Sequence, residues 1–237
     1  MANILLTGAS RGIGLAAREK LALENHLVIG QSTAGGDGLI AADFSQPGAA
    51  DALWERALDV AGIAGERRID VLINNAGVFE AADIADADAF SDAWARSLAI
   101  NLQSAADLCR LAVLHFLANG GGRIINVASR AGHRGDSPKH WHYAAAKGGM
   151  LALTKTIARG YAAHGILAFA VTPGFTMTGM AEDYLASRGG DTLLADIPLG
   201  RVADAAEVGE VIRWLASEAP ASLTGATIDI NGASYVR

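Results

Sequence analysis

Short apolar runs that alternate with longer helical stretches constrain the fold of this chain more than any other feature. Residues 3–7, 26–30, 69–73, 122–127 and 166–172 are apolar almost throughout, whereas a strand with one face in water would alternate polar and apolar residues. Such strands are buried on both faces. Repeated strand–helix units of this kind predict an α/β fold, a doubly wound parallel sheet of about seven strands with helices on both faces.

The helices and the two remaining strands follow from the same periodicity. We expect helices over residues 12–24, 49–62, about 89–117, 143–163 and 205–217, and further strands over 38–44 and 226–232. No repeat, linker or low-complexity tract divides the 237 residues, and 51 % of them are hydrophobic. The sequence therefore predicts a single domain over residues 1–237.

Charge and cysteine content narrow the class of protein. The net charge of −6 argues against a general nucleic-acid binder, which would carry a basic stripe. The single cysteine, Cys109, excludes an intrachain disulfide and fits a reducing compartment. No targeting segment and no apolar run of about 18 residues is visible. We expect a cytoplasmic protein without a membrane segment.

Polar or glycine-rich sequences follow four of the expected strands: "TGASRGIG", "NNAG", "NVAS" and "TPGFT". Ligands bind beyond the carboxyl ends of the strands in such a sheet, so these four tips indicate one site. In the first, Gly8, Gly12 and Gly14 follow a strand and open a helix. Small residues there let the backbone approach a pyrophosphate, which the helix N-terminus stabilises. An ordinary tight turn is the alternative for an isolated glycine trio.

Tyr143 and Lys147 are separated by three alanines. In a helix this spacing stacks a phenol and an ammonium group on one face. The neighbouring positive charge is expected to lower the pKa of the tyrosine, so that a proton moves near neutral pH. An exposed tyrosine beside a solvated lysine would be the interpretation of the pair in isolation.

In their order and spacing, "TGASRGIG", "NNAG", "YAAAK" and "PGFTMT" resemble the short-chain dehydrogenase/reductase family, and the closing "LTGATIDING" extends the resemblance over essentially the whole chain. The resemblance implies a Rossmann-type fold and hydride transfer between a nicotinamide cofactor and a ketone or secondary alcohol. It implies a catalytic tetrad of Asn101, Ser129, Tyr143 and Lys147. Ser129 would orient the substrate oxygen and Tyr143 would exchange the proton. Asn101 would perturb its helix and hold a water that links Lys147 to solvent.

The resemblance also implies the cofactor contacts. Those expected around the phosphates are Gly8, Ser10, Arg11, Gly12, Ile13 and Gly14. Those expected along the adenosine are Ser32, Thr33, Asp43, Phe44, Asn75, Ala76 and Gly77. Those expected at the nicotinamide and its ribose are Tyr143, Lys147, Pro173, Gly174, Thr176 and Thr178. A loop over about residues 177–199 would cover the substrate.

The end of the second strand bears on the choice of cofactor. An NAD enzyme normally places a carboxylate there to bind the ribose hydroxyls, but this chain has Gln31, Ser32 and Thr33. Arg11 and these hydroxyls suit the 2′-phosphate of NADP(H), which we favour, with NAD(H) as the alternative. His140 and His142 have no carboxylate or cysteine grouped with them, so no metal site is predicted.

Within the family the sequence resembles 3-oxoacyl-(acyl-carrier-protein) reductases, and this resemblance implies a small carbonyl substrate, either free or thioester-linked. Such reductases often grip their acidic carrier with basic residues that this chain lacks, although Arg130, Arg134 and Lys139 could substitute. The second hypothesis is an NAD-dependent dehydrogenase of a sugar, steroid or dihydrodiol. A third is a non-catalytic dinucleotide sensor, which loss of the Tyr, Lys or Ser would have indicated. The resemblance implies a homotetramer or dimer.

Overall fold

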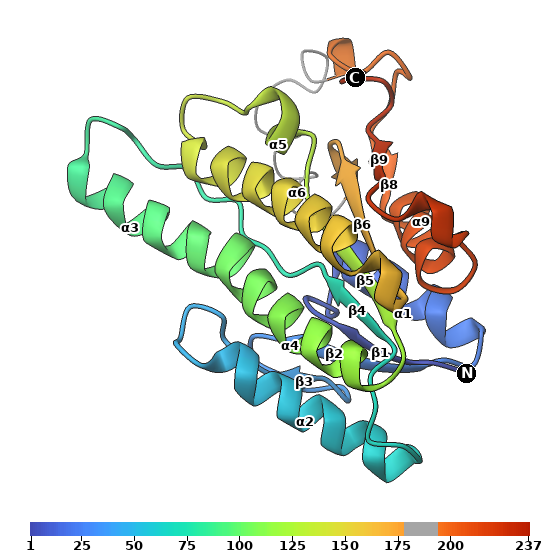
Figure 1. Ribbon diagram of the computed structural model, residues 1–237. Helices are drawn as coiled ribbons and strands as arrows, with labels where there is room; N and C mark the ends of the chain where they lie inside the picture. Colours follow the sequence, from blue (N-terminus) through green and yellow to red (C-terminus); the bar gives the residue numbers. More distant parts are fainter. Residues whose placement is uncertain (178–193) are drawn as a thin grey trace.

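The computed structural model of the protein describes residues 1–177 and 194–237. Seven strands form one parallel sheet in the order β3-β2-β1-β4-β5-β6-β9 (Figure 1). Their bounds are β1 Asn3–Leu6, β2 Leu27–Ser32, β3 Ile40–Ala41, β4 Val71–Asn74, β5 Gly122–Val127, β6 Ile166–Pro173 and β9 Thr227–Ile230. A separate short pair consists of β7 (Thr176–Met177) and β8 (Ala203–Asp204). The predicted fold class is confirmed.

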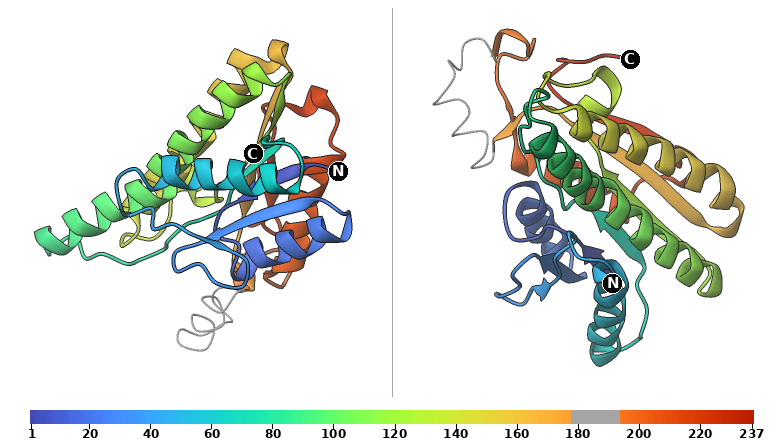
Figure 2. Two further views of the ribbon diagram at one scale, coloured as in Figure 1. Left: turned by 90° about the horizontal axis from the view of Figure 1, so that it is seen from below. Right: turned by 90° about the vertical axis from the view of Figure 1, so that its left-hand side faces the viewer.

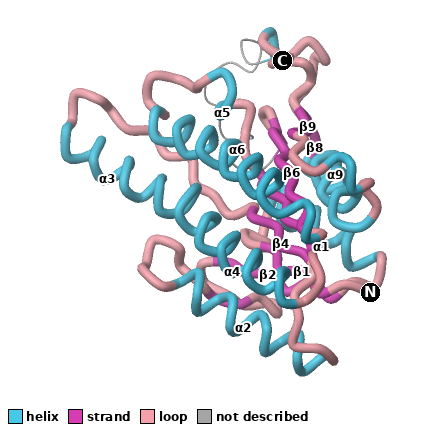
Figure 3. The backbone as a smooth tube through the Cα atoms, in the orientation of Figure 1, coloured by secondary structure: helices cyan, strands magenta, loops and turns pink. Residues whose placement is uncertain are grey.

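Helices cover both faces of the sheet (Figures 2 and 3). Those described are α1 Gly12–Leu23, α2 Ala49–Ala64, α3 Ala87–Leu98, α4 Ser104–Ala118, α5 Ala131–Arg134, α6 Trp141–Tyr161 and α9 Ala205–Ser217. The helices α2, α4 and α6 share one buried cluster with the sheet, and α1 and α9 share the other. Within β5, Ile124 belongs to the first cluster and its neighbour Ile125 to the second. Burial on both faces is why the strands lack polar alternation.

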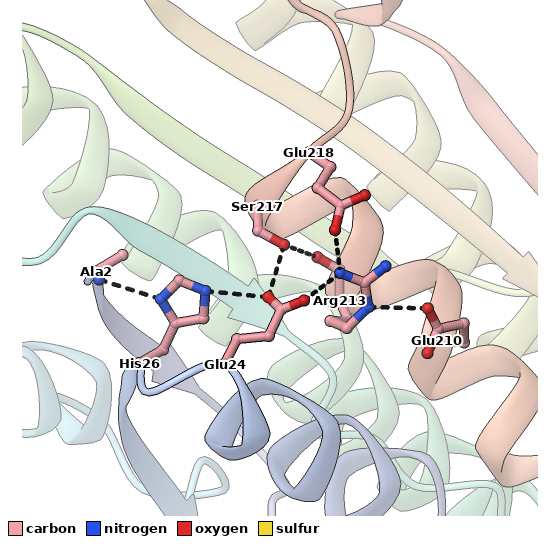
Figure 4. Close-up of polar contacts among 7 residues, drawn as sticks. All are labelled: Ala2, Glu24, His26, Glu210, Arg213, Ser217 and Glu218. Atoms are coloured by element: carbon pink, nitrogen blue, oxygen red, sulfur yellow. Dashed lines mark hydrogen bonds and ion pairs between the residues drawn. The ribbon is translucent and has the colours of Figure 1, made fainter.

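An ion-pair network joins α1 to α9 on the second face (Figure 4). Arg213 on α9 pairs with Glu24 at the C-terminus of α1, and also with Glu210 and Glu218. Glu24 in turn accepts a hydrogen bond from Ser217 at 3.0 Å. A network of this kind fixes geometry better than an isolated surface pair. It joins α9 to the C-terminal end of α1, the end opposite the glycine-rich turn.

The structure differs from the sequence-based expectation in two places. The strand expected over residues 38–44 is reduced to the two residues of β3. Residues 33–39 cross from β2 to β3 without a helix, and Gly35, Gly36, Asp37 and Gly38 all have positive φ. The long helix expected over about 89–117 is interrupted by a π-helix, Ala99–Gln103. None of the helices in the described ranges has the length and apolarity that a membrane span requires.

Candidate active site

The carboxyl ends of β4, β5 and β6 meet at a cleft of about 290 Å³. Residues from all four predicted tips line it, the glycine-rich first tip through Ile13 alone. The residues that line the cleft are Ile13, Asn75, Gly77, Val78, Phe79, Val127, Ala128, Ser129, Arg130, Asp136, Tyr143, Lys147, Pro173, Gly174, Phe175 and Thr176. Three of the four members of the predicted tetrad are therefore brought to one place, with the expected nicotinamide-side residues around them.

Tyr143 and Lys147 lie on the cleft-facing side of α6. The Tyr143 phenol is hydrogen-bonded to the side chain of Ser129, which follows β5. Lys147 is 3 % exposed, and its Nζ donates to the Val127 carbonyl oxygen at 2.8 Å. Its Nζ lies 5.8 Å from the centroid of the Tyr143 ring. The serine, the phenol and the ammonium group thus line one wall.

Burial is the largest cause of the pKa shifts of both Tyr143 and Lys147. It raises the pKa of Tyr143 to about 12, and the hydrogen bond from Ser129 offsets part of that rise. Desolvation of the phenol is the largest cause of this rise and Lys147 is not among its causes, so the lowering expected from Lys147 together with an oxidised nicotinamide stays a prediction. Burial also lowers the pKa of Lys147 to about 8. At neutral pH the tyrosine keeps its proton, a state suited to donating it.

Asn101 lies in the π-helix and is fully buried. Its Oδ1 accepts from the Val78 backbone N–H at 2.9 Å, and its Nδ2 donates to the Val78 carbonyl oxygen at 3.0 Å. A Cβ atom added at Gly77 would lie 2.7 Å from Asn101 Oδ1 and 3.7 Å from Lys147 Nζ. Asn101 therefore holds the segment after β4 in place beside the cleft. Only glycine fits at position 77, between Asn101 and Lys147.

The glycine-rich turn has the geometry of an anion cradle. Gly8 and Gly12 have φ of 64° and 54°, and a Cβ atom at Gly14 would lie 2.0 Å from the Gly8 carbonyl oxygen. No side chain caps α1 at Arg11, so the amides of its first turn face outward unpaired by a cap. Asn75 holds the turn by donating to the Gly8 carbonyl oxygen at 3.0 Å.

Two of the residues predicted on the adenosine side, Ser32 and Phe44, use their side chains within the protein. The Ser32 hydroxyl accepts from the Gly35 N–H at 3.0 Å and donates to the Gly35 carbonyl oxygen, so its proton is used within the loop. The Phe44 ring is buried in the core cluster of α2, which leaves only its backbone for a ligand. Asp43 is partly exposed and also binds Ser45. Ser10, Arg11 and Thr33 are exposed, as a nucleotide-contacting set requires.

Arg18 and Gln31 contribute to this end of the site, and the sequence-based reasoning missed both. Arg18 donates to the Asp37 carbonyl oxygen at 3.2 Å and so brings a second guanidinium beside the β2–β3 loop. Arg18 lies on α1, whereas Arg11 is the N-cap residue that precedes this helix. Gln31 Oε1 accepts from the Gly8 N–H at 2.9 Å, which ties β2 to the glycine-rich turn.

The segment before Tyr143 forms an aromatic wall. The rings of Phe79 and His140 stack with centroids 3.8 Å apart, and Phe79 meets Tyr143 edge-on at 4.8 Å. His142 is buried at the start of α6. Thr178 and most of the expected substrate-covering loop over 177–199 lie outside the described residues. In the described ranges no three His, Cys, Asp or Glu side chains group as metal ligands would.

Comparison with known proteins agrees with this geometry. A family model described as enoyl-(acyl carrier protein) reductase matches residues 8–233. The 3-oxoacyl-(acyl-carrier-protein) reductase of Vibrio cholerae is 33 % identical over 245 residues, which cover 98 % of this chain and 96 % of the relative. The Escherichia coli enzyme of the same name is also 33 % identical, over 249 residues with the same coverage. A short-chain type dehydrogenase/reductase of Sinorhizobium fredii is 36 % identical over 174 residues, which cover 70 % of this chain and 66 % of the relative.

The chain belongs to the short-chain dehydrogenase/reductase family and is an oxidoreductase that acts on alcohol or keto groups.

Proposed function

We propose that the protein reduces the carbonyl group of a small 3-oxoacyl-like ketone with NADPH. The observation that carries this proposal is a partly buried, protonated Tyr143 hydrogen-bonded to Ser129 at a cleft that reaches Ile13 in the glycine-rich turn. The similarity to the 3-oxoacyl-(acyl-carrier-protein) reductases of Vibrio cholerae and Escherichia coli supports the 3-oxoacyl class. NADPH, when bound, supplies the hydride.

The residues present fit such a cofactor. Gly8 and Gly14 let the glycine-rich turn pack against Asn75, Ala76 and itself, which leaves the uncapped first turn of α1 for a pyrophosphate. Gly77 and Gly174 line the cleft, where the nicotinamide would lie. At the adenosine end, Arg11 is exposed, and no ion pair holds it among the described residues. Thr33, directly after β2, is also exposed, and Arg18 adds a positive charge beside the β2–β3 loop.

The proposed proton route uses two side chains. Ser129 Oγ and the Tyr143 hydroxyl together hold the carbonyl oxygen of the substrate, and the tyrosine passes its proton to that oxygen as the alcohol forms. Lys147 Nζ, which is held by its hydrogen bond to the Val127 carbonyl oxygen, stabilises the resulting phenolate electrostatically. Asn101 keeps the Gly77–Val78 segment clear of the lysine.

The rate of reduction should depend on the protonation of Lys147. Because the pKa of Lys147 is lowered to about 8, its ammonium form is complete below that pH and is lost above it. Tyr143, with a pKa of about 12, stays protonated throughout. We expect kcat/KM for ketone reduction to be level from about pH 6 to 7.5 and to fall about tenfold per unit above pH 8.5. A profile that stays level to pH 10 would contradict the role of Lys147.

Cofactor preference should depend on Arg11. Fluorescence-monitored titration is expected to give an NADPH Kd at least about tenfold below that of NADH. The Arg11→Ala variant should lose most of that difference by weakening NADPH alone, since a charge-assisted hydrogen bond is worth about 1.5–3 kcal/mol. Arg56→Ala, on α2, serves as the matched control. Tighter NADH binding by the unaltered protein would favour the NAD-dependent dehydrogenase instead.

A further inference from the structure

Four polar side chains form a buried cluster between the sheet and two of its helices. Asn74 ends β4, Asn126 lies in β5, Cys109 lies on α4 and Thr154 lies on α6. Each is at most 3 % exposed, and none of the four lines the cleft. We call them the Asn126 cluster, because Asn126 contacts the other three. The cluster reaches the strand that precedes Ser129 and the helix that carries the tyrosine and the lysine.

Hydrogen bonds run through the Asn126 cluster in one direction. Thr154 Oγ1 donates its only proton to the Met150 carbonyl oxygen at 2.8 Å, so it must accept from Asn126 Nδ2, which lies 2.9 Å away. Asn126 Oδ1 therefore faces β4, where it accepts from Asn74 Nδ2 at 2.8 Å. Asn74 Nδ2 also donates to Cys109 Sγ at 3.3 Å. The helical bond of one threonine thus fixes the orientation of both amides.

This cluster is an unfavourable way to fill a core. Once Asn74 Nδ2 has donated to its two partners, Asn74 Oδ1 is left buried without a hydrogen-bond partner among the described residues. A buried acceptor without a donor costs free energy, whereas replacing paired polar groups by apolar groups of the same shape is nearly neutral. Apolar side chains would therefore hold these layers together at least as well. What a buried hydrogen-bonded network adds is a unique, rigid arrangement of the elements that it joins.

The two elements joined by Asn126 and Thr154 are those whose side chains meet at the reacting carbonyl. Lys147 Nζ donates at 2.8 Å to the carbonyl oxygen of the residue after Asn126, and Thr154 follows Lys147 by seven residues on α6. The bond from Asn126 to Thr154 is thus a second buried polar contact between β5 and α6, about two helical turns from the first. The hydrogen bond between Ser129 and Tyr143 spans the same two elements.

We propose that Asn126 and Thr154 are positioning residues for the reaction, because their buried hydrogen bond sets the separation of β5 and α6. Through that separation they hold Ser129 Oγ within hydrogen-bond distance of the Tyr143 hydroxyl. The inference rests on the proposed function and deepens it. A displacement of about 1 Å between reacting groups can cost about a hundredfold in rate, so the effect belongs on kcat. The phosphates of the cofactor would bind at α1, which the cluster does not touch.

The test removes the hydroxyl of Thr154 and keeps its shape. In Thr154→Val we expect kcat for the reduction of ethyl acetoacetate to fall about tenfold or more, while KM and the NADPH Kd stay within about threefold. Thr154→Ser keeps the hydroxyl, loses the methyl group and should retain most of kcat. Thr156→Val is the matched control and should keep the full rate. Thr156 is exposed on the same helix and donates to the Ala152 carbonyl oxygen at 3.0 Å, one turn back as Thr154 does.

Three results would overturn the positioning role. They are an unchanged kcat in Thr154→Val, an equal loss in Thr154→Ser or Thr156→Val, and a loss of NADPH affinity in proportion to the loss of kcat. Should Thr154→Val fail to fold, the double variant Asn126→Leu/Thr154→Val replaces it, because it leaves no unpaired group between β5 and α6. We expect that variant to melt near the unaltered protein and still to lose kcat about tenfold. A full kcat in it would contradict the inference.

Failure of the proposed function would look different. If the unaltered protein reduces no ketone, the proposed function fails, and the same variants are compared in the oxidation of a secondary alcohol with NADP⁺ or NAD⁺. The alcohol is the one that a screen of sugars, steroids and dihydrodiols identifies. Ser129 and Tyr143 hold the same oxygen in either direction, so a loss of kcat confined to Thr154→Val supports the positioning role there as well. No loss in that variant overturns it.

Discussion

Tyr143→Phe is expected to lower kcat/KM for ketone reduction by about a hundred- to ten-thousandfold while NADPH still binds. The substitution removes the hydroxyl that hydrogen-bonds Ser129 and keeps the ring that meets Phe79 edge-on. No other phenol lines the cleft in the described part of the chain. The measurement is steady-state NADPH oxidation, with cofactor affinity determined by titration on the same preparation.

Tyr161→Phe is the matched control for this variant. Tyr161 ends the same helix, packs against the core and does not line the cleft. Its removal of a hydroxyl should leave kcat/KM within about twofold of the unaltered protein and the melting temperature nearly unchanged. If both variants lost activity equally, or if Tyr143→Phe retained more than about a tenth of it, Tyr143 would not be the proton donor.

Lys147→Met is expected to lower kcat by about a hundred- to a thousandfold, the usual effect of removing one electrostatic stabiliser from an enclosed site. Methionine fills the buried volume but leaves the Val127 carbonyl oxygen without its 2.8 Å donor. The pH dependence above pH 8 should also disappear from the residual rate, because the titrating group is gone. Kinetics across pH 6–10 measure both effects.

Lys155→Met provides the comparison on the same helix. Lys155 is exposed two turns further along α6 and lies outside the cleft. We expect its variant to keep the rate and the pH profile of the unaltered protein. A Lys147→Met enzyme that still lost activity above pH 8 would show that another group governs that limb.

The strand pattern predicted the fold well, because burial on both faces leaves a periodicity that sequence alone displays. Ala205–Ser217 was expected as a helix and is α9 residue for residue. The shortened β3 was not predictable, since its pairing partners, Gln31 and Ser32, are set by sheet register. The family resemblance implied a perturbed helix at Asn101, and the structure has one there, but its π-helical form was not predicted, because Asn101 hydrogen-bonds to Val78 on a different segment.

The composition of the site was predicted better than its electrostatics. Motif order identified Ser129, Tyr143 and Lys147, which the structure brings to one cleft. Spacing suggested that the lysine lowers the tyrosine pKa, but desolvation depends on what packs around the ring, which spacing does not contain. Ser32 and Phe44 were assigned to the nucleotide by position, yet a loop hydrogen bond and core packing use their side chains.

The most direct test of the proposed activity is the fate of the hydride. NADPH deuterated at the transferring carbon is incubated with the protein and ethyl acetoacetate, and the product is examined by mass spectrometry and NMR. We predict one deuterium on the new carbinol carbon per NADPH consumed, and none with Tyr143→Phe over the same time. NADPH consumption without label in the product, or NADPH binding with no reduction of any ketone, would contradict the account.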